Sequence, residues 1–101
     1  MYVSGVSAQE LMVGSAKRVL TPNPILPVSG GVGMPKPATI KQGDLTARVM
    51  VMTKGNEKIA IVAIDNLGWP AALGDKSRKL VSEIPPENIM IGSTHTHSAP
   101  D

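Results

Sequence analysis

The residues with the clearest chemical potential lie together in the segment GSTHTHSAPD, residues 92–101. This segment holds both histidines of the chain, His95 and His97, with one residue between them. In an extended segment this spacing places both imidazoles on one face, where they could bind one metal ion. Imidazole suits zinc and related transition metals, and the neighbouring hydroxyls could hold the rings through hydrogen bonds. The pair by itself also fits two surface or hydrogen-bonded histidines.

The elements before this segment predict how the histidines are positioned. Apolar runs predict strands over residues 58–64 and 88–93, with a helix over 71–83 between them. This order predicts a crossover connection, so the two strands should run parallel. The histidines then follow the carboxyl end of a strand, where open α/β sheets place ligand sites. Asp65, at the end of the first strand, is expected to hold a turn, with a place beside the metal as the alternative.

Two more strands are expected earlier in the chain. Residues 11–20 form the first, and the alternating segment 45–53 is joined to 58–64 by a tight turn, which predicts a β-hairpin. Strand 58–64 is apolar on both faces, which predicts a sheet that is covered on both sides. The expected fold class is therefore α/β, with a mixed sheet, a hairpin and a βαβ crossover.

Prolines, glycines and apolar positions predict the bounds of the helix and of a long loop. The helix should begin after Pro70 and end before the prolines at 85–86. Its expected apolar stripe consists of Leu73, Leu80, Val81 and Ile84. Residues 27–43 hold four of the 10 glycines and three of the nine prolines, which predicts a long irregular loop, often a functional feature. Within it, residues 30–33 lack the lysine and hydroxyl of a phosphate loop, and fit either a flexible active-site rim or a plain loop.

Composition limits the classes of protein that this chain can belong to. With 101 residues, 2% aromatic residues and no Phe, one small domain with a thin core is expected. The net charge of +2 comes from scattered bases without interleaved aromatics, which argues against nucleic-acid binding. There is no Cys, so disulfides and thiolate metal sites are excluded. No apolar stretch approaches the roughly 20 residues that span a bilayer.

The first residues suggest two alternatives. Residues 6–8, Val-Ser-Ala before Gln9, have the small-residue pattern of a signal-peptidase site. Residues 1–10 are therefore expected to be either the remnant of an export signal, which implies a secreted or periplasmic protein, or a short disordered N-terminus.

The segment 93–100 resembles the THTHSGP signature of the neutral/alkaline non-lysosomal ceramidase family, although Ala99 stands where the signature has glycine. Further pieces resemble the family in the expected order along the chain. They are VGSA at 13–16, LTP at 20–22, ARV at 47–49 and IVAID at 61–65. The resemblance covers most of residues 11–101, which it identifies as the N-terminal portion of a ceramidase-like catalytic domain.

Members of this family are zinc amidases that hydrolyse N-acylsphingosine to sphingosine and a fatty acid. The resemblance implies that His95 is a ligand of Zn²⁺ and that His97 is a catalytic residue near the substrate oxygen. The family completes its zinc site with a His, a Glu and a Tyr much later in the chain, and has a downstream active-site serine. Residues 11–101 are thus expected to be inactive without the remaining part of a larger hydrolase domain.

The resemblance also implies the partners of the full-length protein. These are a ceramide-like lipid amide and peripheral contact with a membrane. Two other interpretations remain open: a different metallohydrolase with a His-x-His site, and a non-catalytic domain or fragment in which the histidines only end a strand.

Overall fold

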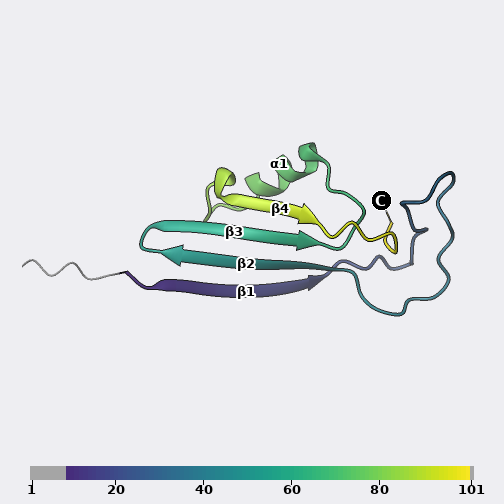
Figure 1. Ribbon diagram of the computed structural model, residues 1–101, viewed down its shortest axis with the longest axis horizontal. Helices are drawn as coiled ribbons and strands as arrows, with labels where there is room; N and C mark the ends of the chain where they lie inside the picture. The colour runs from purple at the N-terminus through teal and green to yellow at the C-terminus, as the bar shows by residue number, and fades with distance from the viewer. Residues whose placement is uncertain (1–8, 101) are drawn as a thin grey trace, which may run out of the picture.

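The computed structural model describes residues 9–100 and forms a single sheet with one helix beside it (Figure 1). In chain order, the elements are β1 (Leu11–Val19), β2 (Thr46–Lys54), β3 (Glu57–Ile64), α1 (Ala71–Lys79), the 3-10 helix η1 (Pro86–Asn88) and β4 (Ile89–Ser93). The expected strands and helix are therefore all present, within a few residues of their predicted bounds.

The four strands lie in the order β1-β2-β3-β4. β1 pairs with β2 and β2 pairs with β3 in antiparallel fashion, while β3 and β4 are parallel. The turn between β2 and β3 contains Gly55, whose φ of 58° is accessible to glycine at little cost. The predicted hairpin, the crossover and the α/β class with a mixed sheet are confirmed.

A small core lies on one face of the sheet, where Ile84 from the connection after α1 packs against β3 and β4. It consists of Ala60, Ile84 and Ile89, with four half-buried side chains around them, those of Val49, Val51, Val62 and Ile91. Among residues 9–100, Ala99 is 0% exposed, and no large side chain is completely buried. The thin core expected from the shortage of aromatic residues is therefore present.

The predicted helix was too long, and its predicted apolar stripe is wrong except for Ile84. α1 ends at Lys79, and Leu80 is 87% exposed. The N–H groups of Leu80 and Val81 donate to carbonyls three residues earlier, which tightens the last turn and ends the α-helix. Ile84 therefore reaches the core from the connection after the helix rather than from the helix itself.

The prediction that the sheet is covered on both sides is wrong for the described residues. Ile59 and Ile61 of β3 are 41% and 39% exposed, whereas Ala60 and Ile64 on the other face are buried. Ile61 lies opposite Met50 of β2 and beside Met90 of β4, so these side chains form one exposed apolar surface. We call this surface, made of Met50, Ile59, Ile61 and Met90, the open face.

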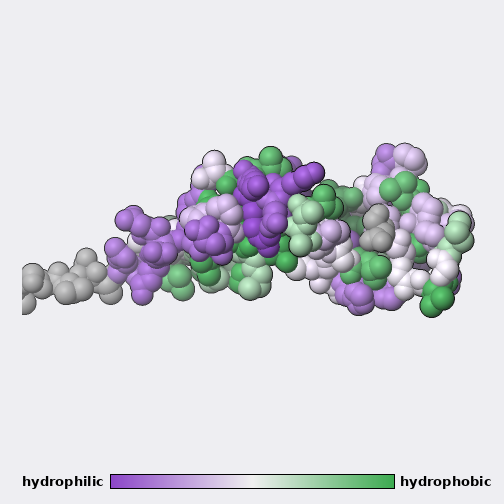
Figure 2. Space-filling model, turned by 90° about the horizontal axis from the view of Figure 1, so that it is seen from above, coloured by the Kyte–Doolittle hydropathy of each residue, from purple (hydrophilic) through white to green (hydrophobic). Residues whose placement is uncertain are grey.

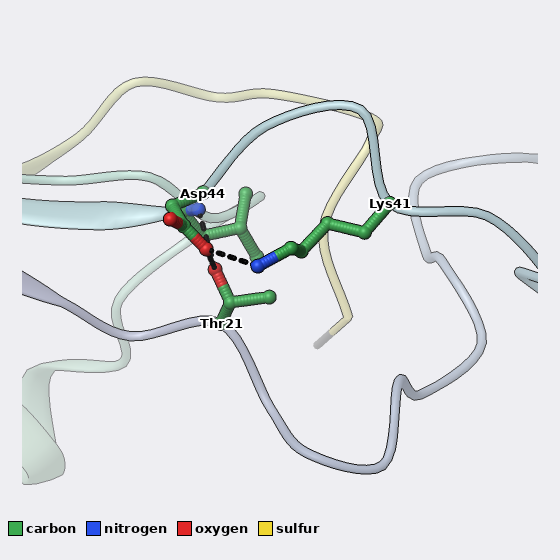
Figure 3. A network of polar contacts seen from close by, with 4 residues as sticks. Thr21, Lys41 and Asp44 are labelled. Carbon is green, nitrogen blue, oxygen red and sulfur yellow. Dashed lines mark hydrogen bonds and ion pairs between the residues drawn. The ribbon is translucent and has the colours of Figure 1, made fainter.

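The long loop between β1 and β2 extends from the end of the sheet at which β3 and β4 finish (Figure 1). Its two ends are joined by a network in which the Asp44 carboxylate accepts hydrogen bonds from Thr21 Oγ1 and Lys41 Nζ, both at 2.8 Å (Figure 3). The Leu45 N–H donates in turn to Thr21 Oγ1 at 2.8 Å. The bond from Lys41, then that from Thr21, lowers the pKa of Asp44 below its ordinary value. The network fixes where the loop leaves the sheet.

Candidate metal and substrate site

His95 and His97 follow β4 directly, as the sequence predicts. The Thr94 N–H donates to the Ile64 carbonyl at 2.9 Å and carries the pairing of β3 with β4 one residue further. The chain then turns at His95, whose φ is 62°. The expected extended geometry is therefore wrong at this residue. A left-handed conformation costs a residue with a Cβ about 1 kcal/mol, and such positions gather at functional sites.

The two imidazoles lie together despite this turn. Their ring centroids are 5.1 Å apart and their planes meet at 85°, edge to face. Both side chains are exposed rather than enclosed in the core. The rings are thus close enough to contact one ligand or ion between them.

A backbone carbonyl holds the ring of His95. Its Nδ1 lies 2.8 Å from the carbonyl oxygen of Leu67, in the loop after β3. A carbonyl oxygen only accepts hydrogen bonds, so Nδ1 carries the proton. In the neutral ring, Nε2 is then left with a free lone pair, which is the tautomer a metal-binding histidine needs.

The long loop packs against His97. The Ser29 N–H donates to the Ala99 carbonyl at 2.9 Å, which holds the loop beside the histidine segment. Gly30 has a φ of 101°, and a Cβ built there would lie 2.8 Å from both Cγ and Nδ1 of His97 and 3.0 Å from Cδ1 of Leu67. Only glycine allows this close approach without displacing the ring.

The loop and the histidines enclose a cavity of about 660 Å³. Its lining comprises the loop residues Val28, Ser29, Gly30, Gly31, Val32, Gly33, Met34, Pro35 and Lys36, together with Leu67, His95 and His97. The expected role of Gly30–Gly33 as a rim beside the histidines agrees with this position. Hydrophobic side chains are visible at the surface of this end of the molecule (Figure 2), and Val32 and Met34 are 109% and 89% exposed.

The described residues could supply only part of a zinc site. Among residues 9–100, no three or more His, Cys, Asp or Glu side chains lie close enough together to hold a metal ion. A catalytic zinc needs three protein ligands and an open position. The histidine pair fits as two nitrogen donors, and the other ligands would have to come from elsewhere.

Asp65 acts in the sheet, as the favoured interpretation of the sequence predicts. Its Oδ2 accepts hydrogen bonds from the Thr46 N–H at 2.9 Å and from Thr46 Oγ1 at 2.8 Å. The bond from the N–H, then that from the hydroxyl, lowers the pKa of the Asp65 carboxyl below its ordinary value of 3.8. This carboxylate joins the end of β3 to the start of β2 and does not line the cavity.

Sequence reasoning missed three contributors to the site: the Leu67 carbonyl, the contact of Gly30 with His97, and Lys36 in the cavity wall. The run of glycines was the one local signal for this contact, because a close approach of backbone to a ring requires a residue without a Cβ. A backbone carbonyl has no signature in the sequence.

No protein-family model matches the chain, and no curated protein and no solved structure matches it either. None of the helices in the described part has the length and apolar character needed to span a bilayer. The expectations for the export signal concern residues 1–8, which lie outside the described residues.

Proposed function

We propose that this protein is a zinc-dependent amide hydrolase resembling neutral ceramidase, with His95 as a zinc ligand and His97 as a catalytic residue. One observation carries the proposal: the two rings lie 5.1 Å apart in the wall of one cavity, and the Leu67 carbonyl holds His95 with Nε2 free. If the histidines only ended a strand, neither the shared cavity nor the left-handed backbone at His95 would be needed.

The residues of the cavity would have separate roles in hydrolysis. Zinc, when bound, would supply an acidified water and polarise the amide carbonyl. His95 would hold the ion, oriented by the Leu67 carbonyl. The exposed ring of His97 would donate a hydrogen bond to the carbonyl oxygen as negative charge develops on it. The apolar residues of the loop would contact the acyl chain of a lipid amide such as N-acylsphingosine.

The open face supports a larger hydrolase domain. Four apolar side chains from three adjacent strands are 38–66% exposed on one surface, and contiguous exposed apolar surfaces of this kind mark contacts with other protein or with membrane. We propose that another part of the same domain covers the open face and brings the remaining zinc ligands to the histidines. A secreted or periplasmic location stays part of this proposal.

Zinc binding and hydrolysis by the full-length protein test the proposal. Zinc content after dialysis, measured by mass spectrometry, should be near one per protein and should fall at least about tenfold in His95→Ala, because one lost ligand weakens the site strongly. Hydrolysis of a short-chain ceramide and of simple N-acyl amides should stop when a chelator is added and return with zinc.

The variants His97→Ala and Ser98→Ala separate zinc binding from catalysis. His97→Ala should keep most of the zinc and lose most of the activity, about 10²-fold or more, as when a hydrogen bond to a developing oxyanion is removed. Ser98→Ala, at an exposed neighbouring residue, should change neither the zinc content nor the activity. Undiminished zinc in His95→Ala would remove this residue from the ligand set and favour the non-catalytic interpretation.

A further inference from the structure

The glycine-rich segment of residues 30–34 has backbone N–H groups without a hydrogen-bond partner among the described residues. The hydrogen bonds of this loop use the N–H groups of Val28, Ser29 and Lys36. Within residues 9–100, no N–H group of residues 30–34 donates a hydrogen bond to another residue. The segment lines the cavity of the two histidines, so these donors are available to a ligand there.

The ionisable side chains that line the cavity are all basic. Among residues 9–100, its lining contains the cation Lys36 and the two imidazoles and includes no carboxylate. Lys36 takes part in neither of the two ion pairs found in residues 9–100, which join Lys41 to Asp44 and Arg78 to Asp75. In the described part of the chain, an anion entering this cavity would meet hydrogen-bond donors and the positive charge of Lys36.

The base of the loop places Lys36 near the histidine contact. Val28 and Lys36 exchange two backbone hydrogen bonds, at 2.9 and 3.1 Å. In such a pair, the two Cα atoms are about 5.5 Å apart. The next residues after Val28 are Ser29 and Gly30, and Gly30 lies against His97. Lys36 and the open N–H groups therefore line the same cavity wall as the contact of Gly30 with His97.

We infer that this wall is a carboxylate-binding subsite, formed by Lys36 and the N–H groups of residues 30–34. The assignment rests on the proposed function in one respect: amide hydrolysis releases a carboxylic acid, whose anion would leave the histidines and meet this wall. Ionised oxygens bind backbone N–H groups and a lysine through short, strong hydrogen bonds. The apolar loop residues Val32 and Met34 would accommodate the alkyl chain.

The test uses the metal-free chain and two ligands that differ in charge but hardly in shape, hexanoate and hexanamide. With hexanoate, the amide signals of residues 30–34 should shift in two-dimensional NMR spectra, saturating at millimolar concentration. Hexanamide should leave them nearly unchanged. Lys36→Gln should weaken hexanoate binding about tenfold, the loss expected for one charge-assisted hydrogen bond. Lys79→Gln, remote from the cavity, is the matched control and should bind as the parent does.

Three results would overturn the subsite: no response of residues 30–34 to hexanoate, an equal response to hexanamide, or unchanged binding in Lys36→Gln. Because the titration contains no zinc, its outcome is separate from that of the metal analysis. Hexanoate binding without zinc binding would leave the subsite standing and reject the hydrolase.

Discussion

At the scale of single residues, Gly30 is the position on which the contact between the loop and the histidines depends. It combines a φ of 101° with a backbone that lies against the ring of His97. Gly31, its neighbour, has open space around the position of a Cβ. Two adjacent glycines thus differ in what they tolerate, and the difference can be measured.

We expect Gly30→Ala to displace the loop from His97 and to lower the free energy of unfolding by about 1–3 kcal/mol, because the methyl group clashes and the backbone is strained. The NMR signals of the His97 ring should shift, and urea denaturation should give the change in stability. Gly31→Ala is the control and should change the ring signals little. If both variants behave alike, the close approach at Gly30 has no role.

At the scale of elements, the connection between α1 and β4 contributes more to the core than the exposed end of the helix does. Ile84 is 8% exposed and packs with Ala60 and Ile89, while Leu80 is 87% exposed. The side chain of Asn88 also donates to the Lys58 carbonyl at 3.0 Å, and Arg78 Nε donates to the Ile89 carbonyl at 2.9 Å. These contacts hold β4, and with it the histidines, in register.

Ile84→Ala should therefore lower the free energy of unfolding by about 2–4 kcal/mol, since it leaves a cavity in a small core. Leu80→Ala shortens an exposed side chain of similar size. It should change the free energy of unfolding by less than about 0.5 kcal/mol. Urea denaturation followed by circular dichroism measures both. Equal losses in the two variants would contradict the position of the core.

At the scale of the whole molecule, the fold is a sheet with one covered face. In residues 9–100, Ile84 from the segment after α1 packs on the face of Ala60, whereas the side chains of the open face are 38–66% exposed. All nine residues of β1 are exposed as well. The proposed function includes a further layer over the open face, because contiguous exposed apolar surfaces mark contacts with other protein.

The same substitution should have different effects with and without such a layer. Ile61→Lys should cost less than about 0.5 kcal/mol in the 101-residue chain, where the residue is 39% exposed. In a protein that carries the proposed covering layer, Ile61→Lys should cost about 2–4 kcal/mol, because a covered lysine would lose its hydration. Thermal denaturation of both proteins gives the comparison. A small effect in both would mean that the open face stays open.

Local patterns in the sequence were sufficient for the architecture. Alternation identified the strands, the turn residues joined β2 to β3, and the order of strand, helix and strand predicted the parallel pairing of β3 and β4. These features depend on neighbours along the chain and on the handedness of crossovers. The adjacency of His95 and His97 was also visible, because they are separated by one residue.

Only the tertiary structure decided how the histidines are held and which face of the sheet is covered. The Leu67 carbonyl that orients His95, the contact of Gly30 with His97 and the place of Lys36 in the cavity arise where distant segments meet. The same holds for the burial of Ile84 in place of Leu80. The physical reason is that hydrophobicity and periodicity describe one segment at a time. A backbone carbonyl, a close approach or a missing layer is a property of the packing between segments.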